Sequence, residues 1–158
     1  MPTPLNILLV EDDENKRLQL ITALNEMPEV GRVLDVHSYK SGLRELISGS
    51  DFDLVMLDMT LPMFDVGPDE PGGATRLYAG RDLLRQMQKR ALSAPVVVVT
   101  QYTAFGEGSD RLTLDELDVE LRGRHPRQYI GHVSYDAVQV GWRRKLSDIV
   151  KLVAGTSI

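Results

Sequence analysis

Short apolar runs alternate with longer amphipathic stretches along the chain of 158 residues. Five of these runs have the length and composition of strands buried on both faces, and they cover residues 5–10, 31–36, 52–57, 95–99 and 128–133. The last run is the weakest of the five because it contains Gly131, which lowers strand propensity. The pattern predicts an α/β domain with a doubly wound, five-stranded parallel sheet and helices on both faces.

The stretches between these runs carry apolar residues at helical spacing. Helices are predicted over about residues 14–25, after a cap at Ser38, across residues 83–91 and at the end of the chain. The apolar stripes that indicate them are, in chain order, Leu18, Ile21, Ala23 and Leu24; Leu43, Leu46 and Ile47; Leu83, Leu84, Met87 and Ala91; and Val138, Trp142, Leu146, Ile149, Val150 and Val153.

Two stretches are longer than the usual connections of about 2–6 residues between a strand and a helix. Residues 63–79 are rich in Gly, Pro and Asp, and residues 101–127 pass from a Gly-containing start through an acidic stretch to a basic end. We interpret residues 1–158 as one domain that carries inserted segments at about 63–79 and 101–127.

Composition and charge exclude several functional classes. The chain has no cysteine, which excludes disulfides, thiolate zinc sites and thiol nucleophiles and favours a reducing compartment. Its net charge of −5 argues against a nucleic-acid surface, which needs a basic patch. No apolar run reaches the roughly 20 residues of a membrane span, and the first residues do not resemble a signal peptide. We therefore expect a cytoplasmic protein that binds neither nucleic acid nor membranes.

Acidic and hydroxyl side chains follow three of the predicted strands. Residues 11–14 are all acidic, Asp58 follows the third strand and Thr100 follows the fourth. In an open parallel sheet, ligands bind beyond the carboxyl ends of the strands, where the strand order reverses. Carboxylates gathered there repel one another unless a cation intervenes, and oxygen ligands of this kind suit Mg²⁺. An aspartate beside a metal ion and a hydroxyl can also accept a phosphoryl group.

The segments LLVEDDENKR, DLVMLDMTLP and VVVVT, in this order and each at a strand end, resemble the receiver domain of two-component response regulators. The resemblance covers most of the chain apart from the two long segments, and it implies a flavodoxin-like receiver fold. It also implies that Asp58 is the phosphoacceptor. Glu11 and Asp12 match the acidic pair that holds Mg²⁺, with Asp12 the closer ligand, while Asp13 offers a competing register.

The resemblance assigns roles to further residues. The backbone carbonyl of Thr60, two residues past the acceptor, would be another metal ligand. Thr100 matches the switch hydroxyl, which moves toward the phosphoryl group and repositions the loop that follows. Tyr102 lies close enough to join that switch, and Tyr129 competes for the aromatic role.

One motif of the family is missing. Receivers normally end the fifth strand with Lys-Pro, and the lysine contacts the phosphoryl group. Depending on the register, the position of that lysine falls here on His132 or Val133, followed by Val133 or Ser134, and the nearby Lys145 lies inside the predicted final helix. The usual coupling of phosphorylation to rearrangement is therefore expected to be weaker.

The resulting functional prediction is a stand-alone response regulator receiver. It would accept a phosphoryl group on Asp58 from a histidine kinase or phosphotransfer protein, with Mg²⁺ as cofactor, and signal to a protein target that the sequence does not identify. A homodimer is compatible with this prediction. We expect no enzymatic activity beyond self-phosphorylation.

Two other functions compete with this prediction. A phosphate-independent adaptor with the same fold would explain the missing Lys-Pro. A phosphatase with an aspartate nucleophile is a more remote alternative, because its signature needs a second aspartate two residues after the nucleophile, where this chain has Thr60.

Overall fold

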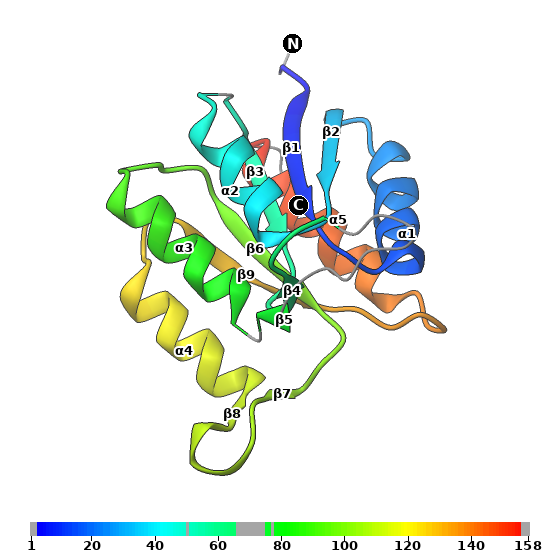
Figure 1. Cartoon of the computed structure of the whole chain (residues 1–158). Helices are drawn as coiled ribbons and strands as arrows, with labels where there is room; N and C mark the ends of the chain where they lie inside the picture. Colours follow the sequence, from blue (N-terminus) through cyan, green and yellow to red (C-terminus); the bar gives the residue numbers. More distant parts are fainter. Residues whose placement is uncertain (1–2, 50, 66–74, 77, 156–158) are drawn as a thin grey trace.

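The computed structural model describes residues 3–49, 51–65, 75–76 and 78–155, and its centre is a five-stranded parallel sheet. The strands lie in the order β2-β1-β3-β6-β9 (Figure 1). Their bounds are Leu5–Val10 for β1, Val30–Val36 for β2, Leu54–Leu57 for β3, Val96–Thr100 for β6 and Tyr129–Ser134 for β9. The predicted doubly wound sheet is confirmed.

Five α-helices cover the two faces of this sheet (Figure 1). They are α1 (Glu14–Asn25), α2 (Tyr39–Ile47), α3 (Ala79–Lys89), α4 (Leu114–Arg124) and α5 (Gly141–Val153). Successive side chains of a strand point to opposite faces. Leu8 of β1 therefore belongs to the core under α2, α3 and α4, and Ile7 belongs to the core under α1 and α5. No helix within the described residues is long and apolar enough to cross a membrane.

The strand order determines where a ligand site can lie. From β1 the chain adds β2 on one side and then β3, β6 and β9 on the other, so the order reverses between β1 and β3. Because all neighbouring strands of this sheet are parallel, the carboxyl ends of β1, β3 and β6 meet at one edge. That edge is where the acidic residues of the sequence were predicted to converge.

The interpretation of residues 101–127 as an insertion is corrected by the structure. They contain the antiparallel pair β7 (Ala104–Phe105) and β8 (Leu112–Thr113), the 3₁₀ turn η1 (Gly108–Asp110) between them, and α4, which is the crossover helix from β6 to β9. The hydroxyl of Thr113 and the carboxylate of Glu116 form a capping box that starts α4. Acidic residues separate the three side chains that α4 buries, Leu114, Leu117 and Leu121, so its stripe is hard to recognise in the sequence.

The first long segment is described only in part. Leu61–Pro62 (β4) pairs antiparallel with Thr75–Arg76 (β5), whereas residues 66–74 and 77 lie outside the described residues.

The β7–β8 pair is joined to the helices beside it. The hydroxyl of Tyr78, just before α3, lies within hydrogen-bonding distance of the carbonyl oxygens of Phe105 (3.2 Å) and Asp110 (3.0 Å). Arg81 of α3 stacks on the Tyr78 ring and forms a salt bridge of 3.1 Å with Glu120 of α4. These contacts tie α3, α4 and the β7–β8 pair together.

Two residues of the predicted helical stripes lie outside the helices. Ala91 follows the end of α3, has a positive φ of 55° and is exposed. Val138 precedes α5 and is 89% exposed. The Asp136 carboxylate accepts hydrogen bonds from the backbone N–H groups of Val138 and Gln139, and this turn delays the start of α5 until Gly141.

Candidate functional site

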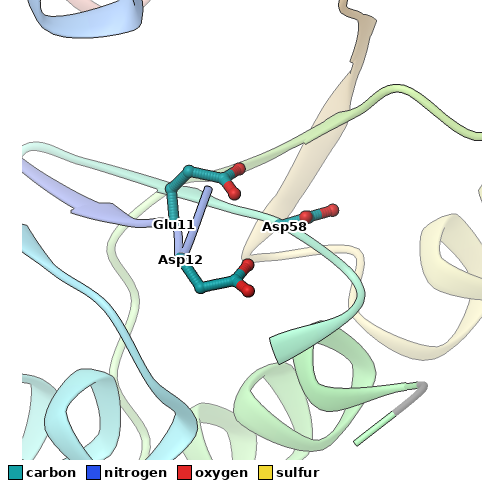
Figure 2. A group of neighbouring side chains, drawn as sticks. All are labelled: Glu11, Asp12 and Asp58. Carbon is teal, nitrogen blue, oxygen red and sulfur yellow. The ribbon is translucent and has the colours of Figure 1, made fainter. Parts of the chain in front are cut away.

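Three acidic residues gather at the carboxyl ends of β1 and β3 (Figure 2). Glu11, Asp12 and Asp58 each offer a carboxylate oxygen, and these oxygens all lie within 4.8 Å of one another. Glu11 and Asp58 are buried, and Asp12 is exposed to solvent. The structure thus brings together the three carboxylates that the sequence predicted as metal ligands.

Asp13, the competing candidate for the acidic pair, has a different position. It is the N-cap of α1, and its carboxylate accepts a hydrogen bond of 2.8 Å from the backbone N–H of Lys16. Its own backbone N–H donates to Glu11 Oε2 at 3.0 Å. The local geometry therefore favours Glu11 and Asp12 as the acidic pair and gives Asp13 a role in starting the helix.

The sequence analysis missed a cation at this site, the side chain of Lys16. Its Nζ lies 2.5 Å from Glu11 Oε1 and 3.3 Å from Asp58 Oδ2, and it donates a hydrogen bond of 2.8 Å to the carbonyl oxygen of Val99. The residue is only 1% exposed. Lys16 therefore connects the ends of β1, β3 and β6 from the first turn of α1.

A signal for this lysine was present in the sequence. Lys16 precedes Leu20 and Leu24 by four and eight residues, so all three occupy the face of α1 that packs on the sheet. A lysine at such a position is buried only when it is paired. The side chain also lies against the ring of Tyr135, whose centroid is 5.9 Å from Nζ.

Burial and mutual charge shift the pKa values of this cluster. Burial, together with the charge of Asp58, raises the pKa of Glu11 from 4.5 to about 7 against the opposing effect of Lys16. Burial likewise raises the pKa of Asp58, although Lys16 and the Met59 N–H act against it. For Lys16, burial lowers the pKa, but the charges of Asp58 and Glu11 outweigh this effect and the pKa is raised. The lysine is therefore an ammonium at neutral pH.

The two oxygens of Asp58 are held differently. Oδ1 accepts a hydrogen bond of 2.7 Å from the backbone N–H of Met59, and Oδ2 faces Lys16. On the other side, Gly80 at the start of α3 lies so close that a Cβ there would be 2.8 Å from the Asp58 carbonyl oxygen. The end of β3 is thus fixed by its neighbours, which gives Asp58 a defined orientation.

A small cavity of about 100 Å³ opens above these groups. Its walls include the three clustered carboxylates and Lys16, together with Thr60, Gln101 and Tyr102. Thr60, the predicted carbonyl ligand, therefore lies at the cavity. Carboxylate oxygens with access to solvent through Asp12 are a donor set that fits a hard cation such as Mg²⁺.

Thr100 is placed at the end of β6, as predicted, but does not line the cavity. It is fully buried, and its hydroxyl accepts a hydrogen bond of 3.1 Å from the backbone N–H of Tyr102. Tyr102 is 46% exposed and packs edgewise on Phe105. Tyr129 is buried and donates a hydrogen bond of 2.6 Å to Asp118 of α4. Of the two candidate aromatic residues, Tyr102 is the one beside the site.

The end of β9 lies one residue after Val133 and two residues after His132, the two predicted positions of the missing lysine. Ser134 ends this strand and pairs in register with Thr100, whereas Val133 is buried in the core. His132 points to α4, where its Nδ1 lies 3.2 Å from Asp118. Lys145 is exposed on α5. The residue that pairs with Thr100 is therefore an exposed serine, and the cation of this site comes from α1.

The raised pKa of Glu11 predicts how the stability of metal-free protein depends on pH. Between pH 4.5 and about 7 the folded state binds more protons than the unfolded chain, so stability falls as the pH rises through this window. We expect a loss of about 2 kcal/mol between pH 5 and pH 7, measured by urea unfolding with a chelator present. Glu11→Gln removes this titration and should flatten the profile. Equal pH dependence in both proteins would contradict the assignment.

The fold is that of known receiver domains. The structure of this chain is similar to the crystal structure of the phosphorylated cyanobacterial phytochrome response regulator RcpA, with a TM-score of 0.64 and 17% identity, over 99% of this chain and 98% of that one. A receiver fold therefore surrounds the acidic cluster. No family model matches the chain.

Two proteins are similar to this chain in sequence over most of their length. The chain is 29% identical over 150 residues to the Detocs response regulatory protein DtcB of Enterobacter cloacae (strain JD6301), covering 94% of this chain and 98% of that protein. It is 32% identical over 146 residues to the uncharacterized protein y4jR of Sinorhizobium fredii (strain NBRC 101917 / NGR234), covering 89% and 93%. The chain belongs to the response regulator receiver domains of two-component signalling.

Proposed function

We propose that the chain accepts a phosphoryl group on Asp58 from a histidine kinase or a phosphotransfer protein. The observation that carries this proposal is the placement of Asp58. Its carboxylate is buried at the end of β3, beside two further carboxylates and in contact with an ammonium. A buried acid has a large desolvation cost, and this arrangement holds Asp58 next to a cavity that can take a small anionic group.

The transfer is a displacement at phosphorus. A carboxylate oxygen of Asp58 attacks the phosphorus of a phosphohistidine or of an acyl phosphate, and a bond from this oxygen to phosphorus forms as the bond to the leaving nitrogen or oxygen breaks. The leaving group keeps the electron pair: an imidazole nitrogen takes a proton from solvent, whereas the carboxylate released from an acyl phosphate leaves as the anion. The product is an acyl phosphate on Asp58, which carries about −1.5 to −2 charges close to Glu11 and Asp12.

Mg²⁺ bound by Glu11, Asp12, Asp58 and the Thr60 carbonyl would neutralise charge on the phosphoryl oxygens. The residues of this chain supply the rest. Asp58 provides the nucleophile, and Thr100 can exchange its hydrogen bond with the Tyr102 N–H for one to a phosphoryl oxygen. The loop after β6 would then change its position and alter the surface offered to a protein partner.

Intact-mass analysis after exposure to acetyl phosphate and Mg²⁺ tests this function. The parent protein should gain the mass of one phosphoryl group, and Asp58→Asn should gain none. Asp51→Asn is a matched control, because Asp51 is an exposed aspartate before β3, at the opposite end of that strand from Asp58, and this variant should be labelled like the parent.

Other results would lead to different conclusions. Label that persists in Asp58→Asn would assign the acceptor to another residue. An unlabelled parent protein, tested with acetyl phosphate and with a phosphorylated phosphotransfer protein, would favour the phosphate-independent adaptor. Continuous release of phosphate from a generic phosphate ester would favour the phosphatase.

A further inference from the structure

We propose that Lys16 is the cation that contacts the phosphoryl group on Asp58, a role that rests on the proposed phosphoacceptor function. Among the described residues, it is the one cation within ion-pairing distance of Asp58 or Glu11. It also lines the cavity into which a group on Asp58 would extend.

The distances place the ammonium where the phosphoryl oxygens would be. Nζ of Lys16 lies 3.3 Å from Asp58 Oδ2. The oxygens of a phosphoryl group bonded to this carboxylate would therefore lie within reach of the Lys16 ammonium. An ammonium has three N–H donors. Two of them are used by Glu11 and by the carbonyl oxygen of Val99, and the third faces Asp58. A phosphoryl oxygen can therefore take the third donor without displacing the other two contacts.

The surroundings hold the ammonium in place before any phosphoryl group arrives. The contact with Val99 O is a hydrogen bond of 2.8 Å to the end of β6, which is independent of the charge on Asp58. The centroid of the Tyr135 ring lies 5.9 Å from Nζ, and the Tyr135 hydroxyl donates a hydrogen bond of 2.9 Å to Gln19 of α1. A donor fixed in this way loses little entropy when charge develops next to it, which is the condition for electrostatic stabilisation of a transition state.

The alternative is that Lys16 only balances the buried charge of Glu11 and Asp58. The two roles are separated with the double variant Lys16→Met/Glu11→Gln, which removes one positive and one negative charge together. It is compared with the parent, which has the same net charge at the site, and with Glu11→Gln, which shows the effect of losing Glu11 alone. If Lys16 only balances charge, the double variant should accept phosphate as fast as the slower of the parent and Glu11→Gln. If Lys16 contacts the phosphoryl group, the double variant still lacks that donor.

Initial rates of phosphorylation by acetyl phosphate at saturating Mg²⁺ provide the first measurement. We expect Lys16→Met/Glu11→Gln to be labelled about 10- to 100-fold more slowly than the slower of the parent and Glu11→Gln, the range that corresponds to one charge-assisted hydrogen bond. The affinity for beryllofluoride, a mimic of the phosphoryl group, is the second and does not depend on turnover. It should fall by a similar factor, followed through the fluorescence of the single tryptophan, Trp142, whose ring lies 5.2 Å from that of Tyr135.

The outcomes distinguish this inference from the proposed function. A parent protein that takes up label, with a double variant whose labelling rate and mimic affinity lie within about twofold of the lower value of the parent and Glu11→Gln, would overturn the role of Lys16 and leave Asp58 as the acceptor. A parent protein that takes up neither label nor beryllofluoride would overturn both proposals. Slower labelling and weaker mimic binding in the double variant would support both.

Discussion

Replacing Lys16 with methionine is expected to lower the free energy of unfolding by about 3–5 kcal/mol at pH 7, the usual effect of removing one member of a buried ion pair. Methionine fills a similar volume, so the cost comes from Glu11 and Asp58, which lose their shared partner while remaining buried. Urea unfolding in metal-free buffer measures the change. The loss should be smaller at pH 5, where these carboxyls take up protons.

Two variants test the cause of this loss. Lys16→Met/Asp58→Asn removes a carboxylate together with the ammonium and should recover most of the stability. Arg17→Met alters the neighbouring residue, whose ion pair with Asp35 (3.2 Å) is more exposed, and should cost about 1 kcal/mol or less. If Arg17→Met and Lys16→Met destabilise the protein equally, Lys16 does not hold the cluster together.

Mg²⁺ should stabilise the folded protein through Asp12 and Asp58. At a concentration 100 times the dissociation constant, one bound ion adds about 2.7 kcal/mol to the free energy of unfolding. Asp12→Ala should abolish this gain because the remaining carboxylates, Glu11 and Asp58, are shared with Lys16. Removing Asp12 also relieves repulsion, so the same variant is expected to be more stable than the parent without metal. Thermal unfolding with and without Mg²⁺ measures both effects.

Asp13→Asn is the matched control for the metal site. Asparagine also caps helices well, so this variant keeps the start of α1 while removing one acidic charge from the same run. It should retain the Mg²⁺ stabilisation. A gain that disappears in Asp13→Asn and persists in Asp12→Ala would move the acidic pair one residue along the chain.

The sheet could be predicted from the sequence because its central strands, β1, β3 and β6, are buried on both faces. The first strand, residues 5–10, and the helix over residues 14–25 have the predicted bounds. The α4 helix was absorbed into an apparent insertion because only three of its side chains are buried, and acidic residues lie between them. Ala91 and Val138 extended the predicted stripes past the real helix ends, which are set by local backbone geometry.

The carboxylates of the site were predicted from the sequence, whereas its cation was missed. Glu11, Asp12 and Asp58 follow strands, and strand ends converge wherever a parallel sheet forms. Lys16 lies in a run of charged residues that is typical of the solvated first turn of a helix. Its spacing to Leu20 and Leu24 indicates the buried face of α1. Its contacts with Glu11, Asp58 and the Val99 carbonyl depend on how three strand ends lie around α1, which no local pattern contains. The last strand, where the family pattern places a lysine, contains none.

The contacts of Tyr78 determine how far a displacement near the site can travel. Tyr102 packs on Phe105, and Phe105 is tied through Tyr78 to the start of α3, which is in turn bridged to α4. A shift of Tyr102 would therefore act, through these contacts, on α3, α4 and the β7–β8 pair. A protein that binds to α3, α4 and the β7–β8 pair would therefore contact a surface whose parts are linked to Tyr102 by direct contacts.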